Sequence, residues 1–138
     1  MFHKNLTPTH FNKMSQGAFP ASLGITITHI EEGKMLGEMP VKKELFAPNG
    51  FLHAGSVITF ADTIAGYSTV LHLPEKAKSF TTIELKSNLL GAAREGVLEC
   101  ESFVEHLGRT THVWRVEVRH KEMKKKVAVF SCTQLILY

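Results

Sequence analysis

The stretch Asn49–Leu71, NGFLHAGSVITFADTIAGYSTVL, decides the fold. Its apolar residues recur at the three- and four-residue spacing of a helix, and they cover nearly the whole circumference. A helix that is apolar nearly all round is buried nearly all round. The stretch contains one carboxylate, Asp62. Because burying an ionised carboxylate without partners is expensive, Asp62 needs either a partner or a chemical role.

The segments on both sides of this helix have the composition or the alternating pattern of β-strands. The expected strands are 23–30 and 35–41 before the helix, and 80–90, 97–107, 111–120 and 127–138 after it. Short turns between consecutive strands require antiparallel pairing, and residues 31–34 are typical of a hairpin turn. The predicted fold class is therefore α+β, with one long helix against one curved antiparallel sheet.

The remaining N-terminal residues predict a short helix over about 8–16, opened by Pro8. The chain has 138 residues, of which 43% are hydrophobic and 21% charged. That size and composition predict a single domain over residues 1–138 with one buried core. A single sheet leaves its edges open, so we expect the protein to dimerise.

The net charge of +3 is too small to argue for a nucleic-acid partner, and RNA- and DNA-binding signatures are missing. The basic run Lys124–Lys126 is interpreted as a turn of solvated lysines, with an anion-binding patch as the alternative. The polar residues of the central stretch favour a buried helix over a membrane span. The N-terminus lacks the pattern of a signal peptide.

Cys100 and Cys132 are too few and too far apart for a disulfide scaffold or a zinc site. Both fall in alternating apolar segments, which predicts buried free thiols in a reducing compartment. We therefore expect a cytoplasmic protein that has no membrane partner, no nucleic-acid partner and no metal.

The start of the long helix is suited to binding an oxygen that gains negative charge. The first turn of a helix has unpaired backbone N–H groups and positive potential. Ala54 and Gly55 are small enough to let a ligand atom approach those groups. His53 lies near the cap, where it either fixes the loop or touches the ligand.

Asp62 lies nine residues after His53, about two and a half helical turns away. A carboxylate in partly apolar surroundings has a raised pKa, which makes it a better base or nucleophile. The alternative interpretation is structural: Asp62 caps a neighbouring loop or pairs with a basic residue.

These residues resemble the hotdog-fold acyl-CoA thioesterases of the phenylacetate-pathway (PaaI-like) type. The resemblance rests on His53-Ala54-Gly55, on Ala61-Asp62 in the apolar helix, and on the segment Thr82–Lys86. It covers nearly the whole chain, about residues 18–138. The family's usual pattern is His-Gly-Gly, with Ala-Asp or Ala-Glu nine residues beyond the His.

The resemblance implies a hotdog fold, in which a curved antiparallel sheet wraps a long helix. It also implies that the subunits form homodimers or homotetramers, with active sites at the dimer interface. It implies a hydrolase that cleaves acyl-CoA to a free acid and CoA without a further cofactor. By resemblance, Asp62 is the catalytic carboxylate, either as nucleophile or as general base. The backbone N–H of Ala54, with that of Gly55, would polarise the thioester carbonyl. The Thr82 hydroxyl would orient the water from across the subunit interface. If the strand register were shifted by one residue, Thr81 would take the place of Thr82.

Two positions depart from the family pattern. Ala54 replaces the middle residue of His-Gly-Gly and adds a methyl group beside the carbonyl site. Ala47 stands six residues before His53, where many members carry Asn or Gln, and the nearest amide is Asn49. Asn49 either takes the role of that amide or forms a turn with Pro48 and Gly50.

The sequence also offers candidate substrate-binding residues. By resemblance, Arg94 is the candidate for contacting the phosphates of CoA, and the alternative is a solvated surface charge. Phe51, Phe60 and Tyr67 are candidates for an apolar acyl slot. The leading hypothesis is an acyl-CoA thioesterase, and the alternative is a non-catalytic acyl-CoA-binding hotdog protein that acts as a sensor or assembly subunit.

Overall fold

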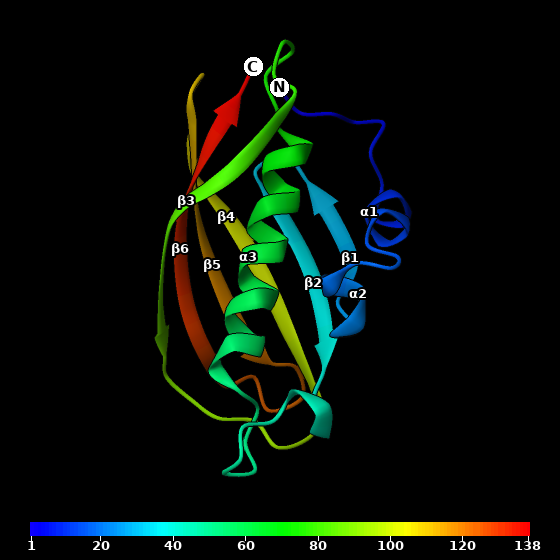
Figure 1. Ribbon diagram of the computed structural model, residues 1–138, viewed down its shortest axis with the longest axis vertical. Coiled ribbons are helices and arrows are strands. Elements are labelled where there is room, and N and C mark those ends of the chain that lie inside the picture. The colour runs from blue at the N-terminus through cyan, green and yellow to red at the C-terminus, as the bar shows by residue number, and fades with distance from the viewer.

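The computed structural model describes residues 1–138, and its long helix lies across one face of a curved six-stranded antiparallel sheet (Figure 1). The sheet has the strand order β1-β2-β4-β5-β6-β3. In chain order the elements are α1 (Pro8–Met14), α2 (Phe19–Ser22), β1 (Thr26–Glu31), β2 (Lys34–Pro40), η1 (Lys43–Leu45), α3 (Ala54–Leu71), β3 (Ser79–Leu89), β4 (Val97–Leu107), β5 (Thr111–His120) and β6 (Lys126–Leu137).

The long predicted helix is α3, and it is buried as the sequence pattern requires. Ala54 is the only exposed residue of α3, and its apolar side chains form the centre of the core. The helix approaches the sheet closely at Gly37 of β2, where a Cβ atom would lie 2.5 Å from the Ile64 side chain. A larger residue at position 37 would therefore displace the Ile64 side chain and clash with the Thr26 carbonyl, which lies 2.9 Å from the same Cβ position.

All six predicted strands are present, and the fold is the predicted hotdog architecture. The β1–β2 turn is the predicted hairpin, with Gly33 at a φ of 77° that favours glycine. The N-terminal helix ends at Met14, two residues before the predicted end, and the sequence pattern did not predict α2 or η1. Cys100 and Cys132 are buried free thiols. No helix combines the length and the apolar character needed to cross a membrane.

The two edges of the sheet differ. At the β1 edge, the Asn12 side chain of α1 accepts a hydrogen bond from the Ile27 N–H at 2.7 Å and donates one to the Ile27 carbonyl at 3.0 Å. This amide occupies the backbone groups that another strand would need. Figure 1 shows α1 and α2 beside β1, whereas the β3 edge has no covering element. Ile83 and Leu85 of β3 are exposed there.

The Asn12→Ala variant should lower the free energy of unfolding by roughly 1 to 2 kcal/mol, because two hydrogen bonds to Ile27 are lost at a partly buried position. Urea denaturation followed by circular dichroism measures the change. Asn5→Ala is the control, since Asn5 is exposed. Equal midpoints for Asn12→Ala and wild type would show that Asn12 does not hold the β1 edge.

Candidate active site

His53 shapes the start of α3. It is the N-cap residue, with φ −63° and ψ 137°, and its Nδ1 accepts a hydrogen bond from the Gly55 N–H at 2.7 Å. Its carbonyl accepts a hydrogen bond from the Ser56 N–H at 2.9 Å. The side chain and backbone of His53 therefore satisfy two of the donors that a helix start leaves unpaired. The Gly55 N–H, one of the two amides predicted to polarise a carbonyl, is occupied in this way.

The Ala54 N–H is left free. Ala54 is the first residue of α3, is exposed, and its N–H has no acceptor in the protein. A free donor at the positive end of a helix dipole favours a partly negative oxygen. Of the two predicted amides, the structure therefore leaves that of Ala54 available for a carbonyl oxygen.

A cavity of about 310 Å³ lies next to Ala54. It is lined by residues that precede the helix, including Asn49, Phe51 and His53, and by Leu89 and Gly91 at the end of β3. The lining is mostly apolar, as in sites that bind small organic ligands. This cavity, which we call the β3-side cavity, brings together several of the predicted site residues.

Arg94 and Asn49 both contact residues at this cavity. The Arg94 guanidinium lies over the Phe51 ring, 4.1 Å from its centre, and makes a cation–π contact with it. The Asn49 Oδ1 accepts a hydrogen bond from the Phe51 N–H at 3.2 Å, which is the turn geometry anticipated for Asn49. The Asn49 side chain also lines the cavity.

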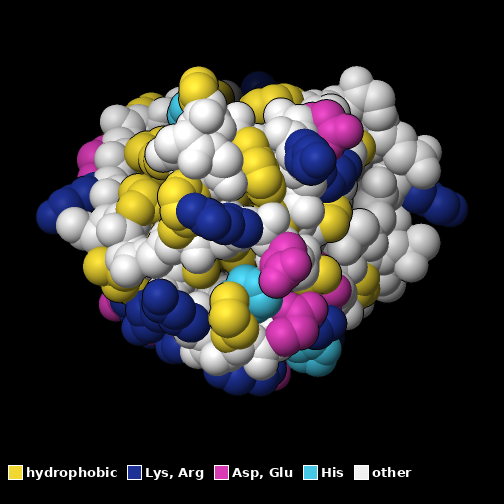
Figure 2. Space-filling view, turned by 90° about the horizontal axis from the view of Figure 1, so that it is seen from below, with side chains coloured by type: hydrophobic (Ala, Val, Ile, Leu, Met, Phe, Trp, Pro, Cys, Tyr) yellow, Lys and Arg dark blue, Asp and Glu magenta, His cyan; other side chains and the backbone are white.

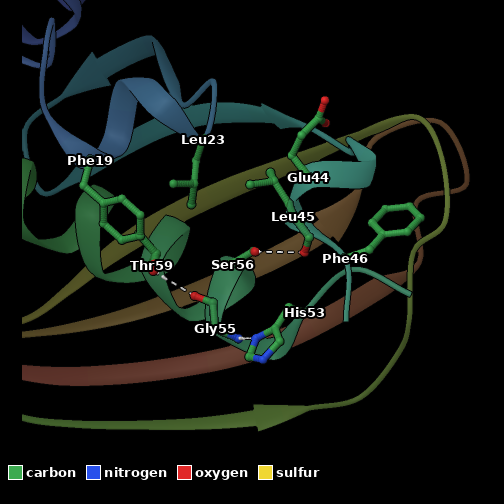
Figure 3. A pocket seen from close by; sticks show the side chains of 9 residues that line it. All are labelled: Phe19, Leu23, Glu44, Leu45, Phe46, His53, Gly55, Ser56 and Thr59. Carbon is green, nitrogen blue, oxygen red and sulfur yellow. Dashed lines mark hydrogen bonds between the residues drawn. The ribbon is translucent and has the colours of Figure 1, made fainter. Parts of the chain in front are cut away.

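A second cavity of about 390 Å³ lies on the other side of the helix start (Figure 3). Phe19 and Leu23 line it from the α2 segment, and His53 lines both cavities. The two hydroxyl groups in its lining are engaged with the backbone, that of Ser56 with the Leu45 carbonyl and that of Thr59 with the Gly55 carbonyl. Neither Asp62 nor Thr82 lines this cavity.

Asp62 is the only charged residue of α3, and it is half-buried between the helix and β3. No ion pair involves Asp62, so it does not pair with a basic residue, which was the alternative structural interpretation. Its one side-chain partner is the Thr82 hydroxyl, 3.3 Å from Oδ1. Burial raises the pKa of Asp62, and the hydrogen bond from Thr82 opposes that rise.

Thr82 lies beside Asp62 of its own chain. The resemblance implied a hydroxyl that orients water across a subunit interface, and within one subunit this hydroxyl is a hydrogen-bond partner of the Asp62 carboxylate. The neighbouring Thr81 is exposed and has no contact with Asp62, so the register selects Thr82. The Thr82 hydroxyl also lies 2.9 Å from Oε1 of Gln134.

Sequence reasoning missed Gln134. It lies on β6 in register with His112, among residues that face the core, and its exposed fraction is 0%. The available signal was its position: Phe130 and Cys132 precede it, and Ile136 follows, at the same two-residue spacing. A polar residue in a buried apolar register requires a hydrogen-bonding partner.

Two residues proposed for an acyl slot are instead part of the core. Phe60 is fully buried, and the Tyr67 hydroxyl lies 2.5 Å from the Ser15 hydroxyl while its ring stacks on Phe11. Neither side chain lines either cavity beside Ala54. Of the three candidate aromatic residues, only Phe51 faces a cavity, because the tight packing of α3 against the sheet and α1 uses the other two.

The Ala54 N–H and the Asp62 carboxylate are far apart within one chain. They lie eight positions apart on α3, which corresponds to about 12 Å along the helix axis. A hydrogen bond of about 3 Å to a carbonyl oxygen and an attack distance of about 3 Å together span much less than this. The two groups of one subunit therefore cannot both contact the same carbonyl group directly.

A model of the Thioesterase superfamily matches residues 49–127, more than half of the chain. The chain is 30% identical over 115 residues to the proofreading thioesterase EntH of Klebsiella pneumoniae, covering 83% of each chain. It is 27% identical over 118 residues to the 1,4-dihydroxy-2-naphthoyl-CoA hydrolase of Escherichia coli, covering 86% of each.

Solved structures agree with the fold. A thioesterase from Haemophilus influenzae superposes with a TM-score of 0.91 at 26% identity, covering 99% of this chain and 94% of that one. The PaaI protein of Escherichia coli superposes with a TM-score of 0.82 at 22% identity, covering 95% of this chain and 91% of that one.

The Asp62→Asn variant should be more stable than wild type at pH 7, and the difference should shrink toward pH 4. The pKa of Asp62 is raised above 3.8 in the folded protein, so the folded state binds this proton more tightly than the unfolded state. The free energy of unfolding of wild type therefore falls as the pH rises from the pKa of Asp62 in the unfolded chain to its higher pKa in the folded protein. The asparagine of the variant does not titrate, so it makes no such contribution. Urea denaturation at both pH values measures the difference, and a less stable Asp62→Asn at pH 7 would contradict it.

Proposed function

Since the chain belongs to the thioesterase superfamily and is a thioester hydrolase, we propose that it cleaves acyl-CoA to a free carboxylic acid and CoA, using Asp62 and the Ala54 N–H. The observation that carries the proposal is a pair of chemically complementary groups. One is a free backbone donor at a helix start, and the other is a half-buried carboxylate without a cation. The name of the Escherichia coli relative, a CoA-thioester hydrolase, supports CoA as the leaving group.

The carbonyl oxygen of the thioester accepts a hydrogen bond from the Ala54 N–H, which stabilises the negative charge that develops during attack. Asp62 then acts in one of two ways. As a nucleophile it forms a bond to the carbonyl carbon, the C–S bond breaks, and water hydrolyses the resulting anhydride. As a general base it takes a proton from the water that attacks the same carbon, and the CoA thiolate leaves and is protonated. Both routes consume one water and need no further cofactor.

We propose that each active site is built from two subunits. The spacing of Ala54 and Asp62 on α3 prevents one subunit from supplying both groups to one carbonyl. Pairing of two β3 edges in antiparallel fashion would bring a second copy to the side of α3 where Asp62 lies. The exposed apolar side chains Ile83 and Leu85 at this edge support such pairing.

The CoA moiety is assigned to the end of the molecule where α3 begins. Seen from below, this end carries Lys and Arg side chains together with acidic side chains and exposed hydrophobic atoms (Figure 2). Arg94 stands over Phe51 at the rim of the β3-side cavity, and the Lys125 side chain lies close to Gly91, which lines the same cavity. A cavity with an apolar interior and cations at its rim suits the pantetheine arm and the phosphates of CoA.

The Ala54→Pro variant tests the role of the Ala54 N–H. Proline is favoured at the first helical position, and the ψ of 137° at His53 suits a following proline, so α3 should form normally without this one donor. We expect kcat for CoA release to fall about 100- to 1000-fold, as for loss of an oxyanion donor. The assay measures the free thiol released from a series of acyl-CoAs of different chain length and aromaticity.

Ala54→Gly is the matched control, since it keeps the N–H and should retain activity. Circular dichroism checks that the fold of Ala54→Pro is unchanged. Wild-type activity in a folded Ala54→Pro variant would overturn the role of this amide. No release of CoA by wild type from any acyl-CoA in the series would overturn the proposed substrate class.

Mixing two inactive variants tests whether the site is shared between subunits. Refolded mixtures of Asp62→Asn and Ala54→Pro contain hybrids in which one of the two sites has an intact Ala54 and an intact Asp62 from different subunits. Random assortment into dimers predicts recovery of about a quarter of wild-type activity. Mass spectrometry of differently labelled subunits verifies that hybrids form. Hybrids without activity would show that the two groups do not meet across an interface.

A further inference from the structure

The Thr82 hydroxyl has one proton and two acceptors within reach. The Gln134 Oε1 lies 2.9 Å from Thr82 Oγ1, and the Asp62 Oδ1 lies 3.3 Å away. A hydroxyl donates one hydrogen bond, and the shorter distance is the better geometry. The proton of Thr82 is therefore directed toward Gln134, and Asp62 receives only the weaker share of this donor.

The orientation of Gln134 is held by its surroundings. The side chain is fully buried, and its Nε2 donates to the Cys132 Sγ at 3.4 Å. This contact leaves the amide oxygen facing Thr82. Because no water reaches the amide, its oxygen depends on the Thr82 hydroxyl as a partner, and losing that bond would leave a buried acceptor unsatisfied.

We propose that Gln134 is a positioning residue, whose amide oxygen holds the Thr82 proton away from Asp62 and so keeps the carboxylate basic. A carboxylate that accepts a full hydrogen bond is a weaker base and a weaker nucleophile than one that does not. Gln134 touches neither substrate nor the reacting atoms, and acts through Thr82. The inference rests on the proposed function of Asp62.

No other charged group near Asp62 takes over this role. The Cys132 thiol, also on β6, has its pKa raised to about 12 by burial and by the nearby Asp62, so it is neutral while Asp62 titrates. Glu84 of β3 accepts a hydrogen bond from Thr133. His112 of β5, in register with Gln134, has its pKa lowered to about 4 by burial. On α3 itself, Asp62 is the only charged residue.

The Gln134→Met variant tests the inference. Methionine fills a similar volume but offers no amide acceptor, so the Thr82 proton should turn to Asp62 and stabilise its ionised form. We expect the pKa of Asp62 to fall by about one unit. The acid limb of the pH profile of kcat/KM should move down by the same amount, and the plateau of kcat should fall roughly threefold.

The double variant Thr82→Val/Gln134→Met separates positioning from a direct electrostatic effect. If Gln134 acts only through the hydroxyl, adding Gln134→Met to Thr82→Val should leave the pKa of Asp62 where Thr82→Val alone puts it. Thr133→Val is the matched control. Thr133 precedes Gln134 on β6 and pairs with the exposed residue Glu84 of β3, so this variant should leave the pH profile of kcat/KM unchanged. If Gln134→Met does not fold, Gln134→Leu removes the same acceptor.

Titration of the Asp62 side-chain carbon by NMR gives a readout that does not depend on activity. An unchanged or raised pKa in a folded Gln134→Met variant would overturn the positioning role, even when CoA is released normally. Absence of CoA release by wild type would instead overturn the proposed function, whatever the pKa does. The two failures are therefore distinguishable.

Discussion

The burial of α3 is the constraint on which the rest of the structure depends. An eighteen-residue helix that is apolar nearly all round has to be covered by the sheet on one side and by other elements on the rest. The close approach at Gly37 shows how little space this packing leaves. A single carboxylate on such a helix can stay ionised only on the side where the covering is incomplete, which is the side facing β3. The position of Asp62 follows from this packing and sets its chemistry.

The polar groups near α3 differ in how completely they are satisfied. Deep in the core, the Trp114 Nε1 donates to Thr69 and the Ser68 hydroxyl bonds to Ser102, so these groups stabilise the helix in place. At the helix start His53 satisfies Gly55 and leaves Ala54 free. The free donor at the helix start is thus at a position that a ligand can reach, whereas the buried polar side chains are paired, except for the Nδ1 of His112.

Much of this arrangement was predictable from the sequence, because the helical period of α3 and the alternation of the strands are strong local signals. Asp62 stood out because it breaks an apolar pattern. The pairing of the Gly55 N–H with His53 was not predictable, since it depends on a side-chain rotamer that no spacing reveals. Gln134 was missed for a different reason: its partner Thr82 is far away in sequence, and only the register of β3 against β6 brings them together.

The closure of the β1 edge by Asn12 has a consequence for assembly. A twisted sheet with two open edges can add copies at both ends without limit, which leads to filaments. With one edge occupied by an amide side chain, edge pairing between copies of this chain must end after two. The N-terminal segment, which lies outside the sheet, therefore leaves only the β3 edge for pairing, and Asn12 contributes to this closure by completing the hydrogen bonding of Ile27.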